Sequence, residues 1–172
     1  MILAAPVLRV YDDTQPIDFT YQAILDYHGR SAPGGVAHAV KVMQRAFPLL
    51  DPDDAVERRE VAITTAFAGP GARDAFEAVT RAVTEGRYTV DAALQAPQRG
   101  PTMANFVFQL SYRGRVVRLQ LRPGHVTEEF IELARTAEPT EVQSERLRYL
   151  KLEMSERLLP LDPSDVYEVI TP

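Results

Sequence analysis

The stretch FVFQLSYRGRVVRLQL, residues 106–121, decides the fold class. Large hydrophobic side chains alternate with more polar ones in its first half, and the alternation resumes in its second half. A period of two places one set of side chains on a single face of a strand. Arg113-Gly114, between the two halves, can turn the chain. The stretch is therefore predicted to form an antiparallel β-hairpin with one buried face.

Strand-like and helix-like segments alternate before this hairpin. REVAITTAF (59–67) and RYTVDAAL (87–94) are short and rich in β-forming residues. The Gly/Pro turn AGPGARD (68–74) separates them and leads into a segment with helical spacing. The apolar face expected for that helix consists of Phe76, Val79 and Val83. We therefore expect a strand, a helix and a second strand ahead of the hairpin.

Helical patterns dominate after the hairpin. The Thr127 hydroxyl can cap a helix whose first turn contains Glu128 and Glu129, where carboxylates interact favourably with the helix dipole. Residues 140–159 have the pattern of a long amphipathic helix that Pro160 stops. The fold class predicted is α+β: an antiparallel or mixed sheet with a C-terminal β-hairpin, packed by several helices, plus the long late amphipathic helix.

Two more helices are expected in the N-terminal part. Asp18 is the predicted N-cap of the first helix, and Gly29 ends it. The second starts at Pro33-Gly34 and carries apolar residues at spacings of four, three and four, which indicate one buried face. FPLLDPDD (47–54) is predicted to be a loop.

Size and composition limit the possible functions. The chain has 172 residues, a net charge of −5, and no cysteine. Its length suits a single domain with a hydrophobic core. The negative charge argues against a broad electrostatic grip on nucleic acid. Without cysteine, the chain has no disulfide, no thiolate nucleophile and no thiolate metal site. No nucleic-acid partner is therefore expected.

The domain is expected to span residues 1–172, with 1–17 as an N-terminal extension and 140–172 as a C-terminal helix and tail. The apolar face of an isolated amphipathic helix needs a partner, so a homodimer formed through this helix is a plausible arrangement. The N-terminus lacks the pattern of a signal peptide, and no apolar run approaches the roughly 18 residues that span a bilayer. We expect a cytoplasmic protein without a membrane partner.

The segment YHGRSAPGG (27–35) is the first candidate site, because it places His28, Arg30 and Ser31 beside a Gly-rich helix start. Free backbone N–H groups at a helix start, near an arginine, favour an anion. His38 lies one turn into the second helix, so both imidazoles can face one opening and serve an acid/base pair or a metal. The ten-residue spacing matches no standard zinc pattern. Either histidine can instead simply close a turn, and the same holds for His125.

A second turn also combines glycine and proline ahead of a predicted helix. Gly69-Pro70-Gly71 precedes a helix start and is followed by Asp74, which can orient a catalytic imidazole or ligate a metal. The other interpretation is a carboxylate stabilised by the helix dipole. The turn lacks the G-x-G-x-x-G pattern, so no dinucleotide fold is predicted.

Four segments, in order, resemble the FmdE-like family of formylmethanofuran dehydrogenase components. They begin with FTYQAILDYHGRSAPGGVAHAVKVMQRA, in which His28, Gly29, Pro33 and Gly34 match the family's His-Gly-His-x-Cys-Pro-Gly motif. The segment around Asp74 and Ala75 and the hairpin, where Arg118 falls on a family arginine, are similar too, as is the closing LLPLDPSDVYEVI. The resemblance covers about residues 18–170 and implies a site at these positions.

This chain departs from the family at the residues that suit a transition metal. Arg30 stands in place of the motif's second histidine, and Ala32 and Ala72 stand in place of two cysteines. Thiolate and imidazole are favoured ligands of such metals. The inherited metal site is therefore expected to be lost or weakened, and formylmethanofuran chemistry is not carried over. No cofactor is predicted, with zinc or another transition metal as the minor alternative.

Three functions remain open from the sequence. The first is binding of a small anionic organic molecule, with or without catalysis, by a site of Arg30, Ser31, Gly34, Gly35, His38 and Arg118. In this interpretation Arg30 offers a bidentate cation to a carboxylate or phosphate, and His28 and Asp74 are the catalytic candidates. The second is a non-catalytic dimeric scaffold or accessory protein. The third is a metal-dependent enzyme with a site rebuilt from His28, His38 and Asp74.

Overall fold

The predicted hairpin lies in the middle of a five-stranded sheet. In the computed structural model, which describes residues 5–170, strand β5 (Val107–Tyr112) turns through Arg113-Gly114 into β6 (Arg115–Leu121). Both turn residues have positive φ, 47° and 81°, as a tight hairpin turn between twisted strands requires. The strand order is β4-β3-β5-β6-β7, with β3 (Ala62–Thr65), β4 (Tyr88–Val90) and β7 (Tyr167–Ile170). Within this sheet only β3 and β4 pair in parallel, so the sheet is mixed and the fold is α+β.

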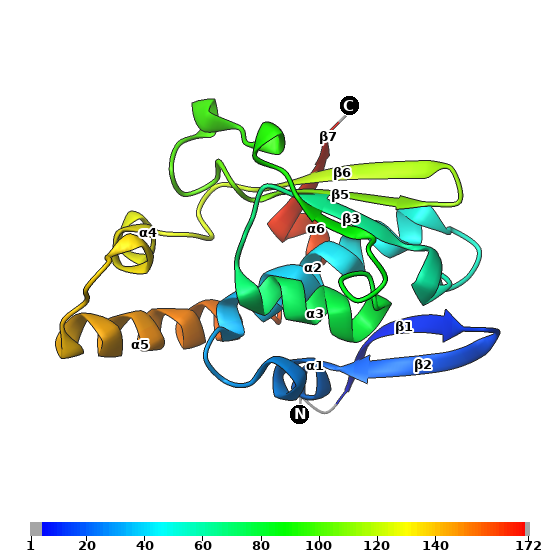
Figure 1. Ribbon diagram of the computed structural model, residues 1–172, viewed down its shortest axis with the longest axis horizontal. Helices are drawn as coiled ribbons and strands as arrows, with labels where there is room; N and C mark the ends of the chain where they lie inside the picture. The colour runs from blue at the N-terminus through cyan, green and yellow to red at the C-terminus, as the bar shows by residue number, and fades with distance from the viewer. Residues whose placement is uncertain (1–4, 171–172) are drawn as a thin grey trace.

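The helices and remaining strands complete three layers (Figure 1). The sheet is one layer and the central helices form the next. A two-stranded hairpin of β1 (Pro6–Asp12) and β2 (Gln15–Thr20) lies with α1 on the far side of these helices. The helices are α1 (Tyr21–His28), α2 (Pro33–Leu50), α3 (Pro70–Thr80), α4 (Glu128–Arg135), α5 (Glu141–Leu158) and α6 (Pro163–Val166), with short 3-10 turns at Arg58–Glu60, Ala92–Leu94 and Pro97–Arg99.

Helix α2 is the centre of the core. It packs against α3 and α5 and touches three strands of the large sheet. Val36, Val40, Met43 and Phe47, the apolar positions expected from the sequence, are all buried. Burying such side chains stabilises the fold by about 1.5–3 kcal/mol each. The α2 prediction is therefore confirmed at its start and along its buried face.

Several boundaries differ from the sequence-based expectation. The segment 47–50, predicted as a loop, is the last turn of α2, with Pro48 inside the helix. Burial of Phe47 and Leu50 holds this turn in place despite the proline. Helix α3 ends at Thr80, where Arg81 adopts a left-handed conformation, so Val83 lies beyond the helix and is partly exposed. The strands predicted at 59–67 and 87–94 exist but are shorter.

Asp18 is not a helix cap, which corrects the prediction for the first helix. It lies in β2 and forms a bidentate ion pair with Arg9 across the small hairpin, at 2.6 and 2.8 Å. Thr20 caps α1 instead, its hydroxyl accepting from the Ala23 N–H at 3.1 Å. Within the described part of the expected extension 1–17, Leu8 and Val10 belong to the hydrophobic core. The alternation of apolar and polar residues in Leu-Arg-Val-Tyr, residues 8–11, indicates a strand with one buried face.

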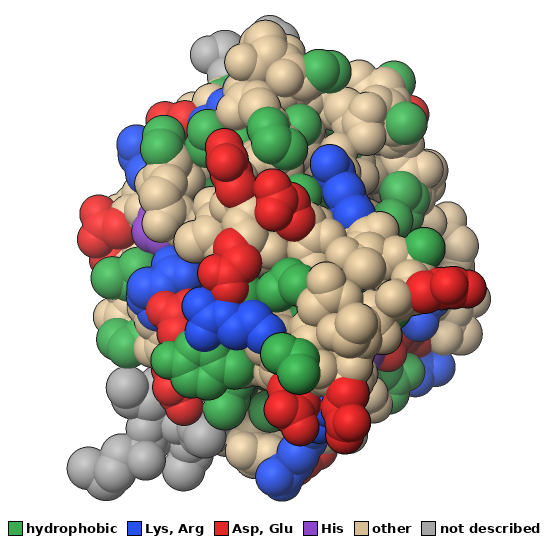
Figure 2. All heavy atoms as spheres, turned by 90° about the vertical axis from the view of Figure 1, so that its left-hand side faces the viewer, with side chains coloured by type: hydrophobic (Ala, Val, Ile, Leu, Met, Phe, Trp, Pro, Cys, Tyr) green, Lys and Arg blue, Asp and Glu red, His purple; other side chains and the backbone are tan. Residues whose placement is uncertain are grey.

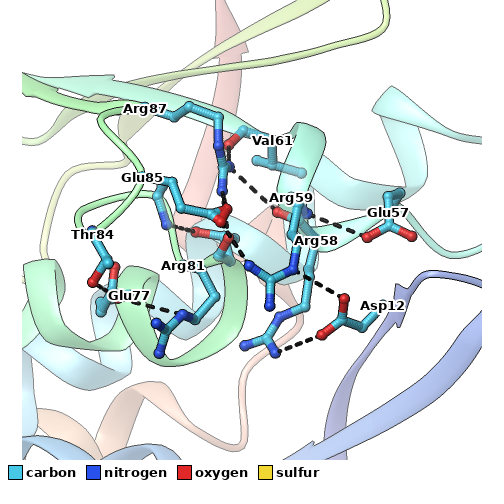
Figure 3. Close-up of polar contacts among 12 residues, drawn as sticks. Asp12, Glu57, Arg58, Arg59, Val61, Glu77, Arg81, Thr84, Glu85 and Arg87 are labelled. Carbon is cyan, nitrogen blue, oxygen red and sulfur yellow. Dashed lines mark hydrogen bonds and ion pairs between the residues drawn. The ribbon is translucent and has the colours of Figure 1, made fainter.

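The small hairpin is tied to the C-terminal end of α3 by arginines (Figure 3). Arg58 donates to the carbonyls of Ala78 and Val79, at 2.7 and 2.9 Å, and to Asp12 of β1 at 3.4 Å. The last carbonyls of a helix lack partners within the helix and carry partial negative charge. A guanidinium with several donors satisfies them together.

The later elements follow the sequence closely. Thr127 caps α4, and Thr140 and Gln143 form a capping box at the start of α5. Helices α4 and α5 project together from one end of the molecule (Figure 1). Among the described helices, none is both long enough and apolar enough to cross a membrane.

Candidate functional site

The two Gly/Pro turns predicted from the sequence meet in space. They start helices α2 and α3, whose first turns pack together so closely that glycine is required. A Cβ atom on Gly71 would lie 2.6 Å from the Ala32 carbonyl oxygen, and one on Gly35 would lie 3.2 Å from the Ala72 nitrogen. Neither helix has a side-chain N-cap. Their free N–H groups therefore contribute partial positive charge at one place.

His28 and Asp74 form a hydrogen-bonded pair beside this junction. The His28 Nδ1 and Asp74 Oδ2 atoms are 2.8 Å apart, which joins the end of α1 to the second turn of α3. Only 6% of the His28 side chain is exposed. The sequence hypothesis that Asp74 orients the imidazole therefore has the geometry it needs, whereas the alternative of a carboxylate stabilised by the helix dipole is not favoured, because Asp74 lies beyond the first turn of α3.

Asp74 stays ionised at neutral pH. Burial opposes the charge, but hydrogen bonds from His28 and Arg73 outweigh that cost and hold the pKa of the carboxyl below its ordinary value. A carboxylate only accepts hydrogen bonds. The His28 Nδ1 atom must therefore carry the proton of this contact.

Ser31 completes a three-residue chain of contacts. Its Oγ atom lies 3.3 Å from the His28 Nε2 atom, on the side of the ring opposite Asp74. Ser31 is exposed, and its hydroxyl contacts no other described side chain. The residues stand in the order hydroxyl, imidazole and carboxylate. The sequence shows no triad pattern here because Ser31 and Asp74 are 43 positions apart in an unfamiliar order.

A cavity of about 370 Å³ opens between the two helix starts and the α4–α5 pair. We call it the interhelical cavity. Its walls are largely apolar, and on one side Phe67 stacks on Phe106 with ring centroids 4.7 Å apart. Phe130, Ile131 and Leu147 of the α4–α5 pair line it as well. Gly35 and the turn Gly69–Gly71, from the two helix starts, complete the lining. A mainly apolar concavity with a few polar groups is the usual form of a small-molecule site.

Two cations from the late helices border this cavity. Lys151 of α5 and Arg135 of α4 are both lining residues. The Lys151 Nζ atom donates to the Ser31 carbonyl at 3.2 Å, so the cavity rim and the Ser31–His28–Asp74 chain are joined. Figure 2, which turns the α4–α5 end toward the viewer, shows basic and acidic side chains interspersed with hydrophobic ones. Lys151, Arg135 and the aromatic walls were missed from the sequence, because they come from segments far apart in the chain that only the fold brings together.

His38 is not part of an accessible site, which corrects its place among the candidates. It is 1% exposed, and its Nδ1 atom contacts the Tyr167 hydroxyl at 2.8 Å. Its Nε2 atom lies 3.2 Å from the Met154 sulfur. Burial, with smaller contributions from the charges of His125 and Arg157, lowers the pKa of His38 to about 3. His38 is therefore a neutral core residue that packs behind Phe106.

The other ligand-binding candidates divide by position. Gly35 lines the cavity, as expected, but Gly34 is buried against Met154 instead. Arg30 is exposed in the turn and is not a lining residue. Arg118 is hydrogen-bonded to Gln109 and, by strand alternation, points to the sheet face opposite the buried Leu119. Placing Arg118 in the same site as Gly35 was therefore wrong.

The histidines do not combine into a metal centre. Within residues 5–170, no group of three or more histidine, aspartate or glutamate side chains is arranged to hold a metal ion. His28 and His38 each have both ring nitrogens engaged by different partners. His125 contacts the Asp165 carbonyl at 2.9 Å, which joins the loop after β6 to α6 rather than closing a local turn. The rebuilt His/Asp site therefore lacks its geometry.

A second hollow, of about 650 Å³, lies between α2 and the small hairpin. Its cations are more fully engaged: Lys41 gives two of its three N–H donors to the carbonyls of Leu159 and Leu161, whereas Lys151 gives one to Ser31, and Arg9 forms a bidentate pair with Asp18. Asp51, Asp53 and Asp54 add negative charge to its wall. The smaller interhelical cavity is the better site for an anion, despite its smaller volume.

Comparison with known proteins gives no assignment for this chain. No protein-family model matches it. No curated protein matches it either.

Proposed function

We propose that this protein binds a small organic anion with an apolar body in the interhelical cavity. One observation carries the proposal: the apolar cavity is bordered by Lys151, Arg135 and two helix starts. Aromatic walls suit the body of the ligand, and the cations and free N–H groups suit a carboxylate or phosphate. The anion expected from the sequence is retained, while its cationic partners change from Arg30 to Lys151 and Arg135.

The experiment is calorimetric titration with 2-naphthoate, an apolar carboxylate that fits the proposed ligand class. We expect binding of 2-naphthoate and weaker binding of 2-naphthalenemethanol, its neutral counterpart. Lys151→Met should weaken naphthoate binding roughly tenfold, because a hydrogen bond to a charged group contributes about 1.5–3 kcal/mol. Equal affinity for the acid and the alcohol would contradict the proposal.

The matched control is Arg148→Met. Arg148 is an exposed cation on the same helix, three positions from Lys151, and it does not line the cavity. Its removal changes the net charge by the same amount as Lys151→Met. Naphthoate affinity should stay within about twofold of the wild-type value, since an exposed charge that does not line the cavity is screened by water and salt. A loss as large as that of Lys151→Met would indicate nonspecific attraction.

The resemblance to the FmdE-like family also stands as a proposal. The order of the four segments supports it, and the residues Arg30, Ala32 and Ala72 argue that the family's metal is no longer held. Elemental mass spectrometry of protein purified without chelator or affinity tag tests this. We expect no stoichiometric transition metal, and bound zinc or iron would overturn the inference that the metal is no longer held.

A dimeric scaffold is the second candidate function. Val142, Tyr149 and Leu152 of α5 are 75%, 58% and 51% exposed. Their spacings of seven and three place them along one stripe of the helix. Such a stripe favours a homodimer through α5. Native mass spectrometry should show a dimer that Leu152→Glu converts to monomer, and a wild-type monomer at about 100 µM would exclude this function, because weaker dimers seldom assemble at cellular concentrations.

A further inference from the structure

We propose that Ser31 is a nucleophile toward carboxylic esters, with His28 as its general base and Asp74 as a positioning residue. The carrying observation is the continuous chain from Ser31 Oγ to His28 Nε2 at 3.3 Å and from His28 Nδ1 to Asp74 Oδ2 at 2.8 Å. Nucleophile and base within reach, with the base oriented by a third group, is the arrangement that activates a serine hydroxyl.

The protonation state follows from the contacts. The Asp74 carboxylate accepts from Nδ1, so in the neutral imidazole Nε2 is unprotonated and can accept from the Ser31 hydroxyl. This is the tautomer that a general base needs. The 3.3 Å separation lies at the looser end of the range that such pairs show before substrate binds.

Ser31 has no structural task that would explain its position. The N-cap residue of α2 is Ala32, and it makes no side-chain capping bond. Ser31 is exposed, whereas the His28 ring behind it is nearly buried. A reagent from solution can therefore reach the hydroxyl, while the base stays fixed between α1 and α3. The hydroxyl is placed for reaction rather than for capping.

The first turn of α2 offers stabilisation for a developing oxyanion. Gly35 follows Ser31 by four positions and lines the cavity, and its N–H group has no backbone acceptor among the described contacts. Preorganised N–H donors at a helix start favour negative charge and are the usual partners of a tetrahedral oxyanion. The Gly35 N–H donor supports the role of Ser31 as a nucleophile, but the proposal rests first on the Ser31–His28–Asp74 contacts.

The reaction balances with water as the only co-reactant. Ser31 Oγ bonds to the ester carbonyl carbon, its proton passes to His28 Nε2, and the alcohol leaves with that proton when the C–O bond breaks. Water then attacks the acyl-Ser31 ester with His28 again as base, which releases the carboxylic acid and restores the hydroxyl. Asp74 stabilises the imidazolium in both steps.

The substrate class rests on the proposed function, whereas the nucleophile does not. Ser31 adjoins Ala32, and its carbonyl is held by Lys151, both of which line the interhelical cavity. An ester with an apolar body of this size, and an anionic group for Lys151 and Arg135, can therefore present its carbonyl at the rim. The substrates expected are small anionic aromatic or aliphatic esters.

The test is covalent labelling with a fluorescent fluorophosphonate. The serine oxygen replaces fluoride at phosphorus and the proton passes to the base, so labelling reports an activated hydroxyl without the natural substrate. We expect the label on Ser31 by peptide mass spectrometry, and its loss in Ser31→Ala. Ser144→Ala, which removes a hydroxyl from α5 away from His28, should label like the wild type. An unlabelled wild-type protein, or equal labelling of Ser31→Ala, would overturn the proposal.

The base and the positioning residue have separate readouts. His28→Ala should label roughly 100-fold more slowly or worse, and added imidazole should restore part of the rate, which a purely structural histidine would not allow. Asp74→Asn should lower the maximal labelling rate and leave the half-saturating probe concentration unchanged. If imidazole fails to rescue a folded His28→Ala variant, His28 is not the base.

The two proposals can fail separately. Both measurements are made on the wild-type protein: fluorophosphonate labelling reports the Ser31 hydroxyl, because the probe needs no anionic group, and 2-naphthoate titration reports the anion site. Labelling without naphthoate binding would keep the nucleophile and reject the anion site. Naphthoate binding without labelling would keep the anion site and reject the nucleophile.

Discussion

Gly71 shows how a single residue sets the spacing of the site. A Cβ atom there would come within 2.6 Å of a backbone carbonyl, that of Ala32, so α2 and α3 would have to move apart. Gly71→Ala is expected to lower the free energy of unfolding by about 1–3 kcal/mol, the usual cost of overpacking. It should also weaken 2-naphthoate binding, since Gly71 lines the cavity. Chemical denaturation and calorimetry measure the two effects.

Gly34→Ala is the matched control for this prediction. Its Cβ atom would meet the Met154 sulfur at 3.1 Å and the Lys151 carbonyl at 3.3 Å, and the methionine side chain can move aside. The loss of stability should be smaller than for Gly71→Ala. An equal loss in both variants would mean that the close approach of the two helix starts is not what requires Gly71.

His38 gives the protein a pH-dependent stability. Its folded-state pKa is lowered to about 3 by burial, with minor contributions from His125 and Arg157, against an ordinary value of 6.5. The unfolded chain therefore binds a proton between these values that the folded protein does not. Stability is full above about pH 6.5 and falls as the pH decreases, by about 1.4 kcal/mol per pH unit.

The prediction compares wild type with His38→Gln between pH 7 and pH 5. Wild type should lose roughly 2 kcal/mol more than the variant over this interval. Carboxylates with lowered pKa values, such as Asp12 and Asp18, lose their contribution mainly below this window. Urea denaturation at both pH values measures the difference. Parallel pH dependence in the two proteins would contradict a neutral buried His38.

Among the residues of the site, those close together in the sequence were predicted better than those that only the fold brings together. His28, Ser31 and Gly35 stand in one nine-residue stretch, so their proximity could be inferred. Asp74 was reached because its turn repeats the same Gly/Pro pattern. Lys151 gives no local signal, because only the packing of α5 beside the Ser31 turn distinguishes it from the other cations of that helix. Burial of His38 likewise depends on β7, more than a hundred positions away.

Arg58 stabilises a whole element, because its side chain binds the C-terminal end of α3. Its guanidinium is mostly buried and donates to the carbonyls of Ala78 and Val79 and to Asp12, the last of these contacts being visible in Figure 3. Arg58→Lys keeps the charge but offers one donor centre instead of a fork. The free energy of unfolding should fall by roughly 2–3 kcal/mol, because buried carbonyls are left unsatisfied.

Arg59→Lys provides the comparison for Arg58→Lys. Arg59 is adjacent in sequence and pairs with Asp12 and Glu85, at 3.0 and 2.7 Å, but 48% of its side chain is exposed. Exposed ion pairs contribute about 0–1 kcal/mol. Denaturant titration should therefore separate the two variants clearly. Equal losses would indicate that the ion pairs, rather than the helix carbonyls, account for the role of Arg58.

Elements were predicted well where local signals and packing agree. The 106–121 hairpin was found because its alternation and its turn residues point to the same structure, and the caps at Thr127 and Thr140 mark the late helices. The β1–β2 hairpin was missed because Asp18 resembles a helix cap in isolation, and only its pairing with Arg9 shows otherwise. The loop predicted at Pro48 was wrong for a similar reason, because burial of the neighbouring residues keeps this segment helical despite the low helix propensity of proline.

At the scale of the whole molecule, the interhelical cavity joins two parts of different stability. It is lined by the starts of α2 and α3, helices with many buried residues, and by α4, which has no fully buried residue. Phe130 and Ile131 only pack against the core from outside. Elements with few buried contacts open more readily than the core. Helix α4 is therefore expected to exchange its amide hydrogens faster than α2.

Binding of 2-naphthoate should slow that exchange. A ligand between Phe106 and Phe130 adds apolar contact to α4 and stabilises its closed position by mass action. Hydrogen exchange measured by mass spectrometry should show protection at residues 128–135 and no change in β1–β2. Protection at Val7–Arg9 instead would place the ligand in the larger hollow beside Lys41, because those residues line it. The measurement thus discriminates between the two cavities, since only the interhelical one has α4 as a wall.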